Sequence, residues 1–151
     1  MKMKLLTPLL LLFSISMLAQ KDHKEKWEQI KALKVSFLTT ELSLTPQESE
    51  KFWPVYNVYE EKQWQIRHDK MRPIIKKIDE VGFDKVNEKD AAAYLEKLQD
   101  AEEELLTLRN KLISDLKPII GSARLLKLKK AEDDFNKKLL EKYKDKDKKK
   151  N

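Results

Sequence analysis

The chain contains no cysteine, and this absence excludes several kinds of site at once. Without a thiol there is no disulfide, no thiolate metal ligand, no cysteine nucleophile and no lipid-modified cysteine. The fold must therefore be held by packing and hydrogen bonds. Histidine is also scarce, because His23 and His68 stand far apart and form no recognisable zinc or copper ligand set. We expect neither a metal nor another cofactor.

Glycine is equally scarce, and this limits the fold class. Two glycines in 151 residues leave little material for tight turns or β-hairpins. Long helices with few connections are the natural alternative. About 120 residues between the two ends suit one ordinary domain. We therefore predict an all-α helical hairpin bundle over residues 20–143, with about four long helices that bend at prolines.

The N-terminus has the pattern of a secretory signal peptide. Two lysines precede an apolar run over residues 5–18, and Ala19 and Gln20 follow it. The run is about 14 residues long, whereas a helix needs about 20 to span a bilayer. We expect a signal peptide over residues 1–19 that is cleaved after Ala19 and directs the protein to the periplasm. An uncleaved anchor is the alternative.

Positive charge gathers at the two ends of the chain. The net charge is +6, but the lysines before residue 5 and those of residues 144–151 carry most of it. The body is nearly neutral, which argues against a nucleic-acid partner. The lysine-rich tail, residues 144–151, is typical of a disordered, solvated end. A tether to anionic polymers or lipid headgroups is the alternative interpretation.

The first helix is predicted over residues 24–42, where apolar residues recur at steps of three and four. A second helix begins directly afterwards. Thr45 can cap it, Pro46 fits its first position, and Glu48 can reach back to complete a capping box. These three residue types at this spacing make the start of the second helix the best-marked boundary in the chain.

The second helix should run toward Ile78, but two prolines interrupt it. Pro54 and Pro73 each lack the amide that would bond four residues back, so each should bend or restart the helix. Residues 81–87 are predicted to form a loop, followed by a cap at Asn87.

The third helix, residues 88–117, has a regular leucine stripe, and Pro118 is expected to end it. A fourth helix should begin after Gly121 and end near Tyr143. The end of the second helix is basic and the start of the third is acidic. An antiparallel hairpin would bring these opposite charges together, although exposed pairs contribute only ~0.2 to 1 kcal/mol each.

The sequence offers little sign of catalysis. It has no glycine-rich phosphate loop, no serine in a nucleophile elbow and no closely spaced histidine pair. Its carboxylates alternate with lysines on helix faces, where they should be ionised and solvated. We therefore expect that the protein is not an enzyme.

Aromatic and basic residues on the second helix are the candidate binding residues. Phe52 and Tyr56 are better explained as core, whereas Trp53 and Trp64 could lie partly exposed, since amphipathic rings suit adaptable recognition. The basic run nearby could attract an acidic partner. The residues proposed for contact with a client or partner are Trp53, Tyr56, Trp64, Arg67, Lys70 and Arg72.

Several of these features together resemble one known family. The stretch Leu44-Thr45-Pro46-Gln47-Glu48, followed by Phe52-Trp53-Pro54-Val55-Tyr56, is similar to the Spy/CpxP-like periplasmic proteins with LTXXQ motifs. More narrowly, it resembles a branch labelled as sensors of sigma factors of the extracytoplasmic-function (ECF) type. Glu48 stands where the motif has glutamine, and the second motif is nearly unrecognisable at Ile120-Gly121-Ser122-Ala123-Arg124.

The resemblance implies a bent four-helix protomer that often pairs into a cradle-shaped dimer. Characterised members are ATP-independent chaperones, inhibitors of envelope-stress sensor kinases, or metal-responsive regulators, and the last role needs residues that this chain lacks. It also implies that Leu44, Thr45 and Glu48 are capping and packing residues, with Pro46 in the same motif.

We expect a chaperone-like envelope-stress protein that binds unfolded envelope proteins. The alternatives are a sensor docked on one membrane-bound anti-sigma factor or kinase, and a structural envelope protein. Long apolar stripes favour a homodimer.

Overall fold

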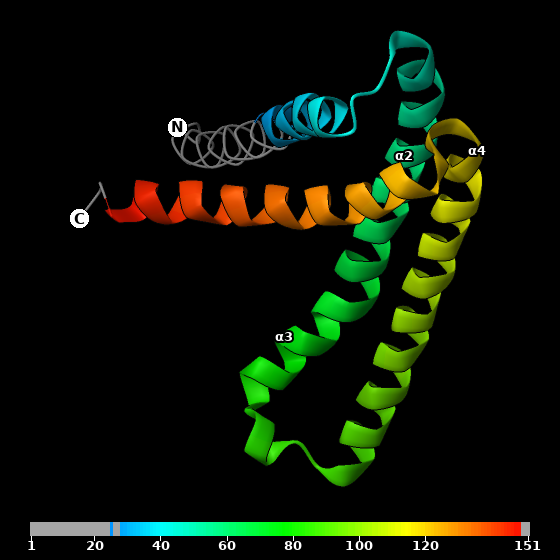
Figure 1. Cartoon of the computed structure of the whole chain (residues 1–151). Coiled ribbons are helices and arrows are strands. Elements are labelled where there is room, and N and C mark those ends of the chain that lie inside the picture. The colour runs from blue at the N-terminus through cyan, green and yellow to red at the C-terminus, as the bar shows by residue number, and fades with distance from the viewer. Residues whose placement is uncertain (1–24, 26–27, 149–151) are drawn as a thin grey trace, which may run out of the picture. The chain divides into compact units, whose positions relative to one another are not determined.

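The computed structural model describes Glu25 and residues 28–148, and their regular structure is helical throughout (Figure 1). The prediction of an all-α chain is therefore confirmed for these residues. The predicted signal peptide 1–19, His23 and the end of the lysine-rich tail, residues 149–151, lie outside them. The described residues divide into two compact units. One comprises the residues up to Ser43 and from Leu128 onward, and the other is Leu44–Lys127.

The first unit pairs the helix over residues 28–41 with the C-terminal part of α4 (Glu88–Lys148). The rings of Phe37 and Phe135 lie 5.7 Å apart in a tilted arrangement. The Lys138 ammonium lies 4.6 Å from the centroid of the Phe37 ring, a favourable cation–π contact. This unit therefore joins the two ends of the described chain through aromatic contacts. Its buried side chains are Leu38, Leu42, Leu128, Ala131 and Phe135.

The first helix ends close to the predicted residue 42. The Leu42 amide donates to the Leu38 carbonyl at 2.9 Å, and the Ser43 amide donates to the Thr40 carbonyl at 3.1 Å. Ser43 has a φ of 49°, a left-handed conformation that usually falls to glycine after a helix. The chain leaves the helix at this residue and enters the second unit.

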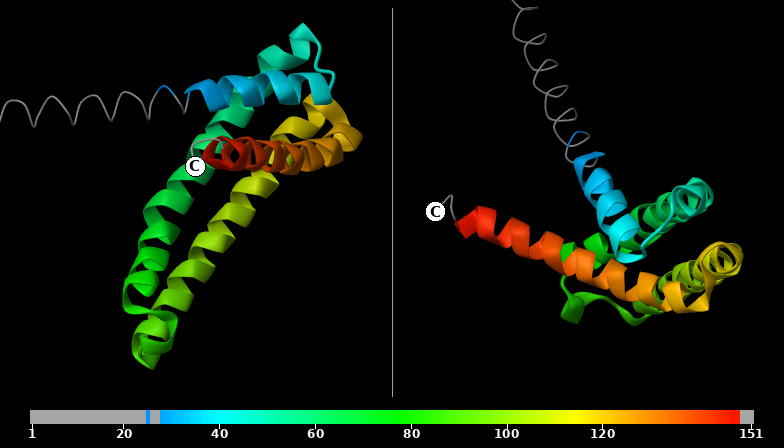
Figure 2. Two further views of the ribbon diagram at one scale, coloured as in Figure 1. Left: turned by 90° about the vertical axis from the view of Figure 1, so that its left-hand side faces the viewer. Right: turned by 45° about the horizontal axis from the view of Figure 1, so that its top comes forward.

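The second unit is an antiparallel hairpin. One arm consists of α2 (Pro46–Gln65), the π-helix η1 (Ile66–Met71) and α3 (Arg72–Val81), as Figures 1 and 2 show. The other arm is the first part of α4. Three polar contacts join the arms. The partners are separated in sequence by 76 positions for Glu48 and Arg124, by 50 for Tyr59 and Arg109, and by 34 for Lys70 and Glu104. The sequence separation therefore falls toward the connecting loop. The predicted charge pairing is confirmed by the Lys70–Glu104 ion pair.

The loop between the arms contains a short 3₁₀ helix, η2 (Phe83–Lys85), which follows Gly82. The predicted cap at Asn87 is confirmed, because its side-chain oxygen accepts from the Asp90 amide at 3.0 Å. The core of the unit lies between the arms. It consists of Phe52, Tyr56, Tyr59, Ile74, Ala101, Leu112, Leu116 and Ile120.

The prolines act differently from one another. The helix restarts near Pro73, as predicted, because α3 begins with this proline in its first turn. A bend or restart was also predicted at Pro54. The helix does not restart there, because α2 continues through this residue. Pro54 is exposed, so the carbonyl that lacks its amide partner, on exposed Glu50, can be hydrated. A proline on the solvent side of a packed helix therefore need not end it.

The prediction that Pro118 ends the third helix is wrong. Pro118 lies inside α4, and the break comes at Gly121, whose φ of 76° and ψ of 166° are not helical. The prediction that a further helix begins after Gly121 is confirmed. Such a conformation is accessible essentially to glycine alone. The last helix also continues to Lys148, beyond the predicted end at Tyr143. Lysine is a good helix former, and no glycine or proline follows Gly121 to stop the helix.

We predict that Gly121→Ala lowers the free energy of unfolding by about 1 to 3 kcal/mol. A Cβ at this position would meet no atom within 4 Å, so the loss comes from the backbone conformation. Chemical denaturation of the purified protein measures the change. Ser114→Ala, at an exposed position in the same helix, is the control and should be nearly neutral. An unchanged stability in Gly121→Ala would contradict the assigned backbone strain.

Candidate binding surface

The first turn of α2 is held by a capping box and an ion pair. The Thr45 amide donates to Glu48 Oε2 at 3.0 Å, and the Glu48 amide donates to Thr45 Oγ1 at 3.2 Å. Arg124 binds the same carboxylate through both terminal nitrogens, one of them at 2.8 Å. Its Nε donates to the Ile120 carbonyl at 2.9 Å, just before the break at Gly121. The first turn of α2 is therefore bound directly to the residues around the break in α4.

The pKa of the Glu48 carboxyl is lowered from 4.5 to about 2. The main cause is the hydrogen bond from the Arg124 guanidinium, and the second is the bond from the Thr45 amide. Both bonds favour the ionised carboxylate. Burial of the pair raises this pKa but does not outweigh them. Glu48 therefore remains an anion throughout the ordinary pH range.

An aromatic cluster follows on α2, formed by Phe52, Trp53, Tyr56 and Tyr59. Phe52 and Tyr56 stack with centroids 5.3 Å apart, and Trp53 contacts both rings edge-on. The Tyr59 hydroxyl accepts from Gln63 Nε2 at 2.7 Å and from Arg109 of α4 at 3.4 Å. Offset and edge-to-face pairs of this kind are each worth ~0.5 to 1.5 kcal/mol beyond their burial. The cluster anchors α2 against α4.

The π-helix η1 follows from the position of Pro73. The amide of Arg72 donates to the carbonyl of Arg67, five residues back, whereas an α-helix would use four. Pro73 itself has no amide to donate. Short π-helical segments within helices occur frequently at functional sites. This segment therefore marks the middle of the α2–α3 arm as a place to look for function.

The start of the π-helix carries an exposed aromatic stack. Trp64 is 46% exposed, and its ring lies parallel to that of His68 at a centroid distance of 4.3 Å. His68 Nδ1 lies 2.8 Å from an oxygen of Asp69. Arg67 and Lys70 are exposed on the π-helix, and Arg72 is exposed at the start of α3. One flat aromatic surface is thus combined with several cations.

The residues proposed for partner contact do not all reach the surface. Trp64, Arg67, Lys70 and Arg72 are exposed, and Trp53 is half-buried. Tyr56 is 1% exposed, so the prediction that this residue contacts a partner directly is corrected. Its side chain packs inside the aromatic cluster, which is the core position that the sequence also allowed.

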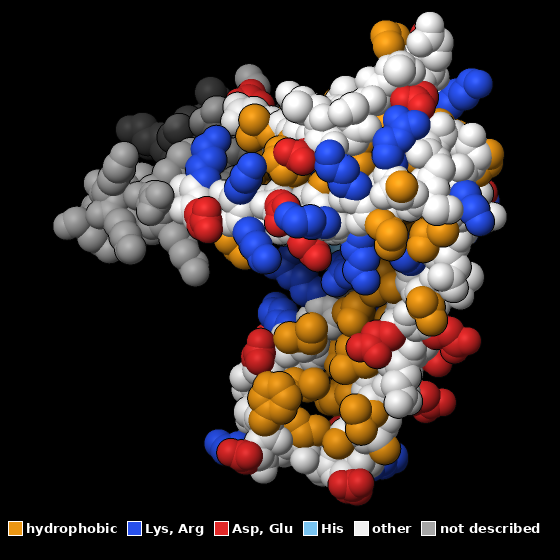
Figure 3. All heavy atoms as spheres, viewed as in Figure 1, with side chains coloured by type: hydrophobic (Ala, Val, Ile, Leu, Met, Phe, Trp, Pro, Cys, Tyr) orange, Lys and Arg blue, Asp and Glu red, His pale blue; other side chains and the backbone are white. Residues whose placement is uncertain are grey.

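Apolar side chains are exposed along both arms of the hairpin. Figure 3 shows hydrophobic side chains gathered between the α3 arm and the facing part of α4. Monomeric soluble proteins rarely expose large contiguous apolar patches without a binding role. The exposed large apolar residues of this unit are Val58, Trp64, Ile75, Val81, Phe83, Leu95, Leu106, Ile113 and Leu126.

Sequence reasoning missed the roles of two arginines. Arg109 interrupts the leucine stripe of the third helix, and its guanidinium lies 5.6 Å from the centroid of the Tyr59 ring. Arg124 binds Glu48 through its guanidinium. A cation within an apolar stripe is a signal that could have suggested the contact of Arg109. Arg124 has no such local signal, because it lies 76 positions from Glu48.

The stability of the protein should depend on the ionisation of Glu48. Because its pKa is lower in the folded state, the extra stability is present above about pH 4.5 and is lost as the pH falls toward 2. We expect Glu48→Gln to lower the unfolding free energy at neutral pH. The difference from the wild type should shrink as the solution is acidified through this window.

Denaturant unfolding at a series of pH values tests this expectation. Glu50→Gln, an exposed position on the same turn, is the matched control. The difference in stability between Glu50→Gln and the wild type should change less with pH than the difference for Glu48→Gln. A constant difference between wild type and Glu48→Gln across the series would contradict the lowered pKa.

The described residues contain neither a recognisable metal site nor a membrane span. Within residues 25 and 28–148, no group of three or more His, Asp or Glu side chains is placed to hold a metal ion. No described helix is both long and apolar enough to cross a bilayer. Comparisons of the chain with protein-family models, with curated proteins and with solved structures found no match.

Proposed function

We propose that this chain is an exported, non-enzymatic protein of the bacterial periplasm that binds unfolded proteins without ATP. The observation that carries the proposal is the combination of exposed apolar and cationic side chains on one arm of the hairpin. Trp64 is 46% exposed, and Arg67 and Arg72 lie exposed close to it in the sequence. Unfolded chains present apolar and acidic segments to such a surface.

The two kinds of side chain contribute at different stages of binding. Charge acts over a distance of about 10 Å at moderate salt and increases the rate of encounter. Apolar contact acts only after desolvation, and it determines how long a client stays bound. A surface with scattered apolar residues favours many weak contacts over one specific complex. This favours a broad client range.

The resemblance to Spy/CpxP-like proteins supports the same proposal. The ion pair between Glu48 and Arg124 joins the positions where this family carries its two glutamines. We further propose the four-helix arrangement of that family. Its helices would be the one over residues 28–41, the α2–α3 arm, and the segments of α4 before and after Gly121. Export by the signal peptide, pairing into a homodimer and the absence of a nucleic-acid partner belong to this proposal.

Two carboxyl groups have a lowered pKa, as expected for ion-pair partners. The pKa of Glu48 is lowered by Arg124, and the pKa of Asp134 is lowered by its hydrogen bond from Lys130. A general acid at neutral pH needs the opposite shift, produced by burial or by a neighbouring anion. These two carboxylates are therefore suited to ion pairs.

Light scattering from a denatured client diluted into buffer without ATP tests the function. We expect near-stoichiometric protein to suppress aggregation, and to do so less at high salt. Trp64→Ala should require roughly two- to fivefold more protein for the same suppression, because an exposed aromatic anchor is lost. Leu140→Ala removes an exposed apolar side chain of the other unit and is the control.

Circular dichroism must show that both variants keep their helices. Equal suppression by wild type and Trp64→Ala would remove Trp64 from the binding surface. No suppression at several-fold excess over unrelated clients would contradict the chaperone proposal. It would favour the alternative of a sensor docked on one anti-sigma factor or sensor kinase.

A further inference from the structure

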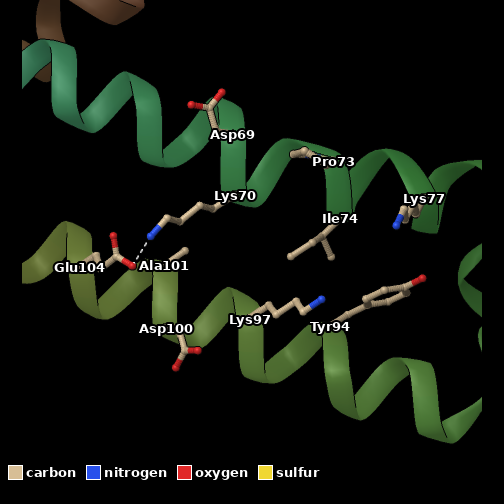
Figure 4. A pocket seen from close by; sticks show the side chains of 10 residues that line it. All are labelled: Asp69, Lys70, Pro73, Ile74, Lys77, Tyr94, Lys97, Asp100, Ala101 and Glu104. Atoms are coloured by element: carbon tan, nitrogen blue, oxygen red, sulfur yellow. Dashed lines mark hydrogen bonds and ion pairs between the residues drawn. The ribbon is translucent and has the colours of Figure 1, made fainter.

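A hollow of about 370 Å³ lies between the two arms of the hairpin, near their connecting loop. Residues of η1 and α3 form one wall and residues of α4 form the other (Figure 4). Its size is within the range of about 300 to 1,000 Å³ that is usual for small-molecule sites. All its lining residues belong to the unit Leu44–Lys127.

The base of the hollow is apolar. Ile74 of α3 is 7% exposed and faces the α4 wall, where Ala101 is fully buried. Because Ala101 contributes only a methyl group, the arms leave space beside it. Pro73 and the ring of Tyr94 extend the apolar lining on either side. An aliphatic chain of a ligand could lie against these groups and release water from them.

The charges around the hollow are arranged unevenly. At one end, Lys70 is bound to Glu104 in an ion pair. Lys77 and Lys97 also line the hollow, and no described carboxylate forms an ion pair with either of them. Figure 4 shows the Lys97 ammonium extending into the space between Ile74 and Tyr94.

The remaining acidic residues do not compensate these two lysines. The carboxylates of Asp69 and Asp100 point away from the space between the arms in Figure 4. Asp69 is in addition hydrogen-bonded to His68. The interior of the hollow is therefore apolar at its base and positive at the Lys77–Lys97 end.

We propose that this hollow binds a single-chain anionic amphiphile, such as a medium-chain carboxylate. The anionic group lies between the ammonium groups of Lys77 and Lys97, and the aliphatic chain lies against Ile74 and Ala101 beside the Tyr94 ring. This ligand site is additional to the holding of unfolded clients. It does not require that function, and the two can be tested separately.

Other ligand classes match the lining less well. A small inorganic anion would leave the apolar base in contact with water, and exposed lysines alone bind such ions weakly. A neutral hydrocarbon would gain nothing from the two lysines. A peptide backbone would bring amide donors into a space whose one inward carboxylate, Glu104, is already paired with Lys70. An anion joined to an aliphatic chain uses both parts of the lining.

Isothermal titration of the full protein with decanoate, below its micellar concentration, tests the proposal. We expect saturable binding of one decanoate per chain. Two ligands that each carry only one part of decanoate are the chemical controls. Decan-1-ol has the aliphatic chain but no charge, and acetate has the carboxylate but no long chain. Decan-1-ol should bind at least about tenfold more weakly, because it loses the hydrogen bonds to the charged lysines. Acetate should also bind at least about tenfold more weakly, because it buries no aliphatic chain.

The double variant Lys77→Gln/Lys97→Gln should weaken decanoate binding at least about tenfold for the same reason. A matched variant, Lys76→Gln/Lys89→Gln, removes two exposed lysines from the same helices outside the hollow and should bind like wild type. Lys76 forms its own pair with Glu80 at 3.6 Å. All four positions are exposed, so the fold should persist, and circular dichroism checks this.

Three outcomes would overturn the proposal. They are the absence of saturable decanoate binding, equal binding of decan-1-ol or acetate, and equal loss in the two double variants. The client-aggregation assay on Lys77→Gln/Lys97→Gln separates this site from the proposed chaperone function. Unchanged suppression together with lost decanoate binding would support two independent sites. Failure of suppression in the wild-type protein would contradict the chaperone proposal and leave the decanoate result valid.

Discussion

The bidentate ion pair between Glu48 and Arg124 sets the register of the hairpin on which the rest of the second unit depends. The Glu48 carboxylate caps the first turn of α2 and at the same time binds a guanidinium from the far end of the other arm. Arg124 also satisfies the Ile120 carbonyl at the break in α4. One pair therefore fixes the start of one arm, the end of the other and the alignment between them. The aromatic cluster, the Lys70–Glu104 pair and the hollow all lie further along arms that this pair has aligned.

Much of the helical framework could be predicted from local signals. The capping box of Thr45 and Glu48 and the cap of Asn87 were identified correctly, because a cap needs only a few adjacent residues. The opposite charges on the two arms also predicted their pairing. The prolines were harder, since the effect of a proline depends on whether its helix face is packed or exposed. Pro118 was expected to break a helix that continues past it, and the break lies at Gly121.

The candidate surface was predicted in part. The partial exposure of Trp64 was one of two interpretations of the aromatic residues, and the basic segment beside it was visible in the sequence. The burial of Tyr56 depends on Phe52, Trp53 and the opposite arm, which periodicity alone does not place. The hollow arises because small Ala101 faces Ile74 across the hairpin, and its lining residues are up to 35 positions apart in the sequence. Such a site becomes visible only when the register of the two arms is known.

The π-helix has a consequence for the way in which the hairpin opens. Its Arg72 amide reaches back five residues, and the next residue, Pro73, offers no amide at all. The arm therefore lacks one backbone donor directly after the π-helix. Amide protons exchange with solvent through such local openings, and the segments with the fewest supporting bonds exchange first. Exchange of the amides next to Pro73 would therefore report local opening of this arm, beside the wall of the hollow.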